Sequence, residues 1–231
     1  MWQANPAWGS PRIVAELHKL GIEVAKSTVE KYKPTGERSP SATWRAFLDL
    51  HLKEFVAVDF FIVPTATFKV LFVFLVLAHN RRRIVHFNVT EHPSAQWTAQ
   101  QLVEAFPFDT APRYLSRDGD GIYGDRVRRR IDSLSIDEIV TAPASPWQNP
   151  YVERMIGSLR RELLDHVVVL NERHLKRLLS SYLDYYHPWR THQSLMRAAP
   201  DGRPIRSARA GDVTEHPAVH GLHHHYLPMA Q

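Results

Sequence analysis

The sequence predicts an α/β fold in which a mixed sheet carries helices on both faces. Three strand-like runs, 55–63, 70–78 and 84–89, follow one another with connections short enough for antiparallel hairpins. Helical and strand-like segments then alternate over the rest of the chain. This order, with hairpins first and alternation afterwards, is typical of a mixed sheet covered on both sides.

The later elements are expected at defined places. Ser94–Phe106 has the apolar spacing that a helix needs, and Asn149 and Pro150 suit the N-cap and first position of a long helix. The other expectations are short strands at 113–115 and 138–141 and helices at 125–134 and 171–186. Helices are thus expected between the later strands.

Two short helices are predicted within residues 1–33. Ser10 and Pro11 suit the start of the first helix, Gly21 ends it, and Ser27 or Thr28 lies near the start of the second. A helix, a glycine turn and a second helix outline a helix-turn-helix, although a plain helical hairpin fits the pattern as well. The side chains expected to face inward are those of Ile13, Leu17, Leu20, Val24, Val29 and Tyr32.

Composition excludes several classes of protein. The chain has 231 residues, of which 44% are hydrophobic and 23% charged, so a sizeable core forms and wholesale disorder is excluded. It has no Cys, which excludes a disulfide scaffold, Cys-ligated zinc and thiol catalysis. The net charge of +5 is compatible with a nucleic-acid partner and equally with a solvated basic surface.

No membrane association or secretion is expected. The longest apolar run, Val70–Ala78, is too short to cross a bilayer. The first residues lack the basic and apolar regions of a secretory signal.

Asp59 is the first candidate site residue. It lies inside the apolar run 55–63, and an aspartate is almost never buried without a partner. A metal ion is the strongest partner for such a carboxylate, while a strand with one solvated face is the alternative.

Asp118 and Asp120 follow the short strand at 113–115. Loops at the carboxyl ends of strands are where open α/β sheets bind ligands. An Asx turn explains the same residues without a site, and the spacing of a calcium loop is absent.

Glu153 falls in the first turn of the long helix that starts near Pro150. It shares one face of that helix with Gly157 and Arg160 at helical spacing, and the missing side chain of Gly157 leaves room for another backbone to approach. A carboxylate, a gap and an arginine suit a metal ion beside a phosphodiester. The alternative is an ordinary acidic residue favoured by the helix dipole.

Together, Asp59, Asp118 and Glu153 resemble the DDE triad of retroviral-type integrases and bacterial insertion-sequence transposases, most closely the integrase-core transposases of the IS3/IS481 type. Further matching motifs are Val58-Asp-Phe-Phe61, Asn80-Arg-Arg-Arg-Ile84, Ser145-Pro-Trp-Gln-Asn-Pro-Tyr-Val-Glu-Arg154 and Tyr185-Tyr-His-Pro-Trp-Arg-Thr-His-Gln-Ser-Leu195. Two departures are the Asp118-Gly-Asp-Gly121 sequence, which leaves Asp118 and Asp120 as alternatives for the second acid, and a spacing from Asp118 to Glu153 that is one residue short. Counting back from Tyr123, which matches an aromatic residue of the family, favours Asp118.

The resemblance implies four segments. They are a helix-turn-helix remnant at 1–33, a linker at 34–50 that ends in a short helix from Trp44 to His51, an RNase H-like catalytic core at 51–205 and a C-terminal tail at 206–231. His223 to His225 are assigned to a terminal strand or to the tail.

The resemblance also implies the chemistry. Three carboxylates suit two Mg²⁺ or Mn²⁺ ions, with Asp59 as the bridging ligand, and the reaction is DNA end cleavage followed by strand transfer. The expected partners are DNA and further copies of the chain, and the expected location is the cytoplasm of a bacterium, at the nucleoid. The alternatives are a metal-dependent nuclease of the same fold and a decayed transposase that only binds DNA.

DNA contacts are expected from Gln148 and Asn149 near the scissile bond and from Arg160 and Arg161 on the Glu153 helix. Arg128 and its neighbours Arg126, Arg129 and Arg130 are candidates for phosphate contacts, with a solvated helix face as the alternative. The aromatic side chains of the 185–195 motif are expected to pack in the core rather than stack on bases.

Overall fold

The computed structural model describes residues 10–32, 42–108, 110–141, 149–204 and 213–229. The chain divides into two compact units, an N-terminal unit, Met1–Ser41, and a core unit, Ala42–Gln231. Each unit is described by itself. Within the described residues, no helix is long and apolar enough to cross a bilayer.

The N-terminal unit contains α1 (Ser10–Lys19) and α2 (Lys26–Lys31), close to the predicted helices. Gly21 ends α1 with a left-handed φ of +75°, a conformation that favours glycine. Ile13 and Val29 are buried, whereas Leu20 and Tyr32, predicted to face inward, are 66% and 72% exposed. Two helices this short share too little surface to cover every apolar side chain.

The core unit is built on a five-stranded sheet of order β3-β2-β1-β4-β5. The strands are β1 (Phe55–Pro64), β2 (Val70–Ala78), β3 (Arg83–Thr90), β4 (Tyr114–Arg117) and β5 (Asp137–Val140). β1, β2 and β3 pair antiparallel, and β4 pairs parallel with both β1 and β5. The predicted mixed sheet is confirmed.

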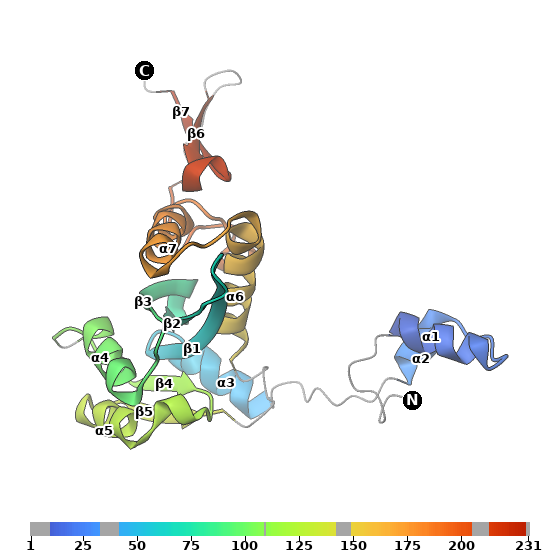
Figure 1. Cartoon of the computed structure of the whole chain (residues 1–231), viewed down its shortest axis with the longest axis horizontal. Coiled ribbons are helices and arrows are strands. Elements are labelled where there is room, and N and C mark those ends of the chain that lie inside the picture. The colour runs from blue at the N-terminus through green and yellow to red at the C-terminus, as the bar shows by residue number, and fades with distance from the viewer. Residues whose placement is uncertain (1–9, 33–41, 109, 142–148, 205–212, 230–231) are drawn as a thin grey trace. The chain divides into compact units, whose positions relative to one another are not determined.

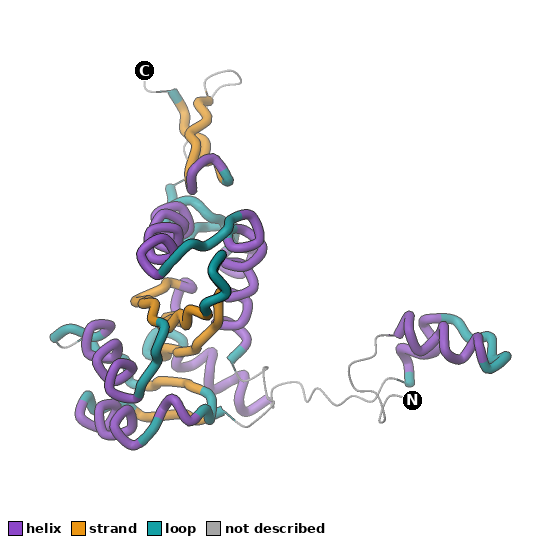
Figure 2. The backbone as a smooth tube through the Cα atoms, viewed as in Figure 1, coloured by secondary structure: helices purple, strands orange, loops and turns teal. Residues whose placement is uncertain are grey.

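Helices cover both faces of this sheet (Figures 1 and 2). The α-helices of the core unit are α3 (Ala42–His51), α4 (Ala95–Ala105), α5 (Asp125–Ser133), α6 (Pro150–Glu162) and α7 (Glu172–Tyr186). Short 3-10 turns are η1 (Asn80–Arg82), η2 (Gly121–Tyr123), η4 (Leu164–His166), η5 (Gln193–Leu195) and η6 (Val219–Gly221).

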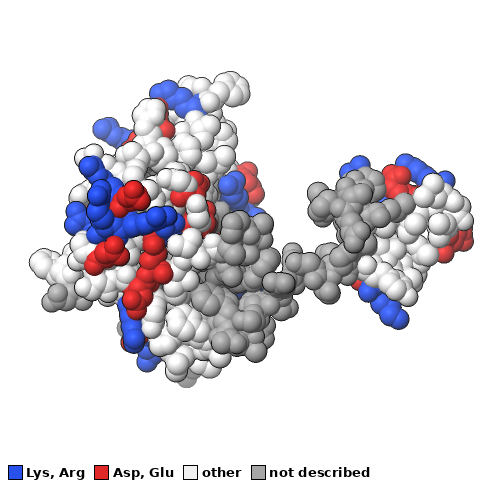
Figure 3. Space-filling view, turned by 90° about the horizontal axis from the view of Figure 1, so that it is seen from below, with Lys and Arg blue, Asp and Glu red and all other residues white. Residues whose placement is uncertain are grey.

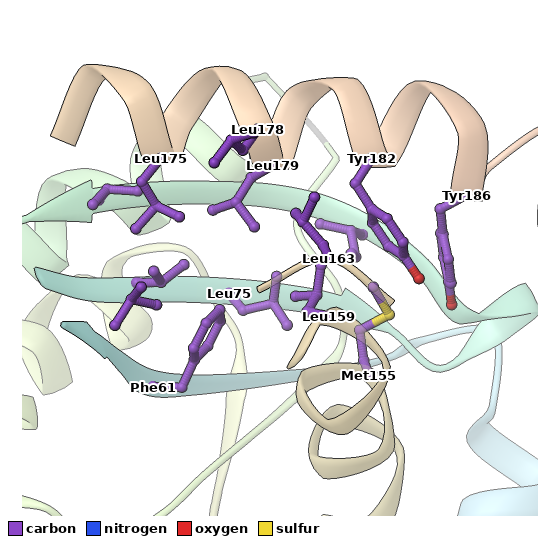
Figure 4. Close-up of a cluster of buried hydrophobic side chains, with 14 of the residues drawn as sticks. Phe61, Leu75, Met155, Leu159, Leu163, Leu175, Leu178, Leu179, Tyr182 and Tyr186 are labelled. Atoms are coloured by element: carbon purple, nitrogen blue, oxygen red, sulfur yellow. The ribbon is translucent and has the colours of Figure 1, made fainter. Parts of the chain in front are cut away.

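The alternation of side chains along β1 separates two cores. Ala57 and Phe61 pack in the cluster formed with α6 and α7, and Figure 4 shows the apolar side chains of both helices directed at the strands. Val56 and Val58 pack in the second cluster, with α4 and α5. Successive strand residues face opposite sides of a sheet, so odd-numbered residues of β1 face α6 and α7.

Helix α3 changes the predicted domain boundary. The segment 34–50 was assigned to a linker, but α3 belongs to the core unit and Leu48 is buried. The Phe47 ring packs edge-on against Phe55 and Tyr114, with centroid distances of 6.3 and 5.1 Å. Aromatic packing on the first residue of β1 therefore makes α3 part of the folded unit.

The C-terminal residues also fold. Residues 213–229, predicted to be mostly tail, form a hairpin of β6 (Val213–Ala218) and β7 (His223–Pro228). The hairpin packs by ring stacking, with His223 4.8 Å from Tyr185 and His225 3.9 Å from Trp189 between centroids. The aromatic side chains of the 185–195 motif thus take part in packing, as predicted.

The turn between β2 and β3 is tied to a distant segment. Arg81 donates hydrogen bonds to the carbonyl oxygens of Ala199 and Pro200, and Arg83 forms an ion pair with Asp201. These contacts join parts of the core unit that are more than a hundred residues apart in the chain.

Candidate active site

Asp59 lies in the middle of β1, on the face of the sheet that packs against α6. Its position between Ala57 and Phe61 places it on that face, because all three are odd-numbered residues of one strand. The carboxylate oxygen Oδ1 accepts a hydrogen bond of 2.8 Å from the backbone N–H of Phe60. No arginine, lysine or histidine forms an ion pair with Asp59 among the residues described.

Asp118 is the first residue after β4. β1 and β4 run parallel with Ala57 opposite Ser116, so extending this register by two residues aligns Asp59 with Asp118. Asp118 Oδ1 accepts a hydrogen bond of 3.2 Å from the N–H of Asp120. The side chain of Asp120 is engaged elsewhere, since it caps η2 by accepting from the N–H of Ile122. Parallel pairing therefore brings two acids from distant parts of the sequence to the neighbouring strands β1 and β4 in the interior of the sheet.

Glu153 lies in the first turn of α6, with Pro150 at the start of the helix as predicted. Asn149 occupies the N-cap position, but its side chain makes no capping hydrogen bond, contrary to the prediction. Its backbone is not in the extended conformation of a usual N-cap, and its side chain is buried. Helix α6 packs on the same sheet face as Asp59.

The charges of the three acids act on one another. Burial, together with the negative charges of Asp118 and Glu153, raises the pKa of Asp59 to about 7, against the lowering effect of the hydrogen bond from Phe60. Burial also raises the pKa of Glu153. Asp118, and not Asp120, is the aspartate whose charge acts on Asp59. In the part of the chain that the structure describes, no three acidic or histidine side chains approach closely enough to form a ready-made metal site.

The sequence did not predict the ion pair between Arg117 and Glu138, which lies next to Asp118. Arg117 is 2% exposed, its Nε lies 2.6 Å from Glu138 Oε1, and its Nη1 donates to the Asp118 carbonyl oxygen at 2.7 Å. Tyr123 is also buried, and the charges of Asp59 and Asp118 help to raise its pKa. Arg117 shares its strand face with Leu115, two residues earlier, which is the signal that points to burial.

The predicted DNA-contact residues differ in how far they are exposed to solvent. Gln148 lies outside the described residues, and Asn149 is buried. Arg160 is exposed and donates to the Ile62 carbonyl oxygen at 3.4 Å, so it lies beside the end of β1. The Arg161 guanidinium lies 3.1 Å from the position of a Cβ on Gly157. The face at Gly157 is therefore covered in this structure by the flexible end of a side chain of the same helix.

Arg128 is exposed and pairs with Asp125 on the same helix. Its neighbours Arg126, Arg129 and Arg130 instead line a hollow of about 790 Å³ between α5 and α4, together with Trp97 and Gln100. Seen from below, the surface of the core unit has acidic side chains lying among the basic ones (Figure 3). On α5 itself, Asp125 and Asp132 lie in the same helix as the four arginines, and Asp125 pairs with Arg128, so this helix does not carry positive charge alone.

The fold is that of an integrase or transposase catalytic domain, of the RNase H-like class. The catalytic domain of Mos1 mariner transposase aligns with a TM-score of 0.52 at 15% identity, over 64% of this chain and 80% of that one. A chain of the simian T-cell lymphotropic virus intasome aligns with a TM-score of 0.53 at 14% identity, over 75% of this chain and 66% of that one. The HTLV-2 integrase catalytic core aligns with a TM-score of 0.51 at 10% identity, over 65% and 95%.

Residues 134–200 match the family model described as the integrase core domain. This segment contains β5, α6 with Glu153, and α7. No curated protein sequence matches the chain. The present chain spans about two thirds of the intasome chain to which it is similar. The predicted integrase-core fold is confirmed, while the IS3/IS481 subtype stays a prediction.

Proposed function

We propose that this chain catalyses metal-dependent DNA end cleavage and strand transfer, with Asp59, Asp118 and Glu153 as the catalytic acids. The observation that carries the proposal is the state of Asp59. It is partly buried in the middle of the central strand β1 without a cationic partner among the described residues, and two further acids act on it electrostatically. A buried, strongly perturbed carboxylate beside other carboxylates is typical of an active site.

The donor set fits Mg²⁺ or Mn²⁺. All three acids offer hard oxygen ligands, and the repulsion that raises the pKa of Asp59 is what a bound cation relieves. Asp59, Asp118 and Glu153 would hold the ions. When bound, a pair of such ions activates an attacking oxygen and stabilises a leaving oxygen at phosphorus.

Known proteins of this fold support the same assignment. One structure of the Mos1 catalytic domain contains Mg, and the HTLV-2 integrase core is described in complex with magnesium in dimeric and trimeric forms. The simian viral chain belongs to an intasome. We accordingly propose a divalent cofactor, DNA as substrate and homo-oligomerisation for this chain.

The side chains have distinct roles in this mechanism. Asp59 is fixed by its strand and by the hydrogen bond from Phe60, so it supplies a rigid ligand. The Arg117 guanidinium donates a hydrogen bond to the backbone carbonyl oxygen of Asp118 and so restrains the backbone at this residue. We expect Arg160, which lies beside the end of β1, to bind a phosphate of the DNA. Water is the first nucleophile and a DNA 3′-hydroxyl the second, both without a covalent enzyme intermediate.

The test uses the whole chain, labelled duplexes carrying the DNA that flanks its reading frame, and a plasmid target with Mn²⁺. Wild type should nick the flanking duplex and join the new 3′-end to the plasmid. Glu153→Gln should remove both reactions, and Asp120→Asn, a matched change of a neighbouring acid, should keep them.

Two rival functions give different results in this assay. A nuclease of the same fold cuts the duplex and never joins it. A chain that only binds DNA shifts the duplex and is as inactive as Glu153→Gln. Calorimetric titration with Mn²⁺ tests the site without DNA, since binding to wild type should be lost in Glu153→Gln and kept in Asp120→Asn. Equal binding of Mn²⁺ by both variants would contradict the assignment of Glu153.

A further inference from the structure

A second, basic pocket lies beside the candidate active site. It has a volume of about 240 Å³ and is lined by residues of the β2–β3 turn, α6, the end of α7 and the segment after it. Four of its lining residues are arginines, Arg82, Arg154, Arg161 and Arg190, and no acidic residue is among those that line it. Arg154, Ser158 and Arg161 recur at the spacing of one helix face, about a quarter of a turn around α6 from Glu153.

Most of the positive charge in this pocket is unneutralised. Arg190 is bound by Glu162, with Nε 2.8 Å from Oε2. Arg82, Arg154 and Arg161 have no carboxylate partner among the described residues. Three guanidinium groups therefore face one small space without a counter-charge, an arrangement that repels itself and attracts an anion.

The pocket is built rather than formed by loose surface side chains. The Arg82 guanidinium lies 3.3 Å from the centroid of the Tyr151 ring, and burial together with the charge of Arg154 lowers the pKa of Arg82. Arg190 Nη1 lies 3.2 Å from His192 Nδ1, so the Glu162 ion pair and the imidazole hold its guanidinium in place. Two of the four arginines are thus positioned in advance by neighbouring groups, which reduces the entropy lost on binding a ligand.

The size and chemistry select the ligand. A volume of about 240 Å³ is below that of sites for drug-sized molecules and equals roughly eight water molecules. Arginine forks pair with the oxygens of phosphate in a bidentate manner. Serine hydroxyls from Ser158 and Ser194 add neutral donors at the wall. We propose that this pocket binds a phosphate group, either from a nucleic-acid backbone or as free phosphate.

The experiment uses the full chain in EDTA, so that binding is independent of strand cleavage, and pyrophosphate as the probe. Isothermal titration calorimetry should detect binding to wild type. The double variant Arg154→Gln/Arg161→Gln should weaken it at least tenfold. Both side chains are exposed, so the variant should fold, and its melting curve checks this. The control Arg173→Gln/Arg177→Gln removes the same charge from exposed positions of α7 and should bind as wild type does.

A second arm identifies the source of the phosphate. If the pocket takes a DNA phosphate, pyrophosphate displaces a short duplex from wild type, and the double variant lowers the salt dependence of duplex binding by about one to two phosphate contacts. If duplex binding is unchanged while pyrophosphate binding is lost, the pocket serves free phosphate. The proposal is overturned if wild type binds neither probe, or if the double variant binds both as wild type does. None of these results depends on whether the chain cuts or joins DNA.

Discussion

The two faces of the sheet each enclose one charged group, Arg117 at the end of β4 and the partly buried Asp59 in the middle of β1, and the two groups have opposite surroundings. On the α4–α5 face, Arg117 binds Glu138 and the Asp118 carbonyl oxygen. On the α6–α7 face, Asp59 has one backbone N–H as a partner and two like charges nearby. Arg117 is paired, as a structural buried charge is. Asp59 has no counter-charge, which is typical of a carboxylate that binds a cation.

The largest effect is expected from Asp59→Asn in the DNA assay. The amide keeps the shape of the side chain but removes the charge that a divalent cation requires. Cleavage and joining should fall about a thousandfold or more, equivalent to roughly 4 kcal/mol of transition-state stabilisation. The rate of nicking in Mn²⁺ measures this. A variant as active as wild type would show that Asp59 is not a catalytic acid.

Glu138→Ala tests the opposite face. It leaves the Arg117 guanidinium buried without its carboxylate, and the free energy of unfolding should fall by about 3 kcal/mol, the low end for a buried pair, because Glu138 is 21% exposed. Urea denaturation measures the loss. Replacing both partners, in Arg117→Met/Glu138→Leu, should recover most of it. A loss no larger than that of an exposed ion pair would show that Arg117 is not a structural charge.

The same Asp59→Asn variant should be more stable than wild type in EDTA. The pKa of Asp59 in the folded chain, about 7, lies above its ordinary value of 3.8, so between these pH values the folded chain holds a proton that the unfolded chain has released. Wild-type stability therefore falls as the pH rises through this window. At pH 8 the asparagine variant should gain up to about 4 kcal/mol.

Thermal unfolding at two pH values checks this expectation. The advantage of Asp59→Asn should be largest at pH 8 and smaller at pH 5, where wild-type Asp59 is already protonated in the folded chain. Asp120→Asn, which removes an exposed acid, is the control variant. An advantage that is equal at both pH values would contradict the assigned burial cost.

The smallest effect is expected from Gly157→Ala. Alanine is favoured over glycine inside a helix by about 1 kcal/mol, and the new Cβ meets only the flexible end of Arg161, at 3.1 Å. The melting temperature should therefore rise slightly. The free energy of pyrophosphate binding should change more than the free energy of unfolding, because the displaced Arg161 guanidinium lines the basic pocket. A clear loss of stability would mean that Arg161 cannot move.

The sheet and most helix positions were predictable because they follow local patterns. The strands at 55–63, 70–78 and 84–89 appear at almost the predicted residues, since alternation and turn residues act over a few positions. The order of the three acids was visible in the same way. Their mutual electrostatic interaction depends on the parallel pairing of β1 with β4, which no short stretch of sequence contains.

The features that the sequence did not predict have a common cause. Arg117 next to Asp118 resembles an exposed pair of opposite charges, and its actual partner, Glu138, comes from another strand. The sequence favoured Asp118 over Asp120 by counting back from Tyr123, and the parallel register of β1 with β4 supports the same choice. The exposure of Leu20 and Tyr32 depends on how much surface two helices share, and the terminal hairpin depends on stacking against Tyr185 and Trp189. Each of these outcomes is set by tertiary contacts.

The arginine contacts of the β2–β3 turn join residues that leave the ribosome far apart in time, so we expect them to form late in folding. Arg81 and Arg83 leave the ribosome early, but their partners at 199–201 emerge more than a hundred residues later. The central hairpins therefore remain without this closure while α4 to α7 are still being made, and such long-range closure is slow. A chain that stops before residue 199 retains all three candidate acids but leaves this turn open, and so is prone to aggregate.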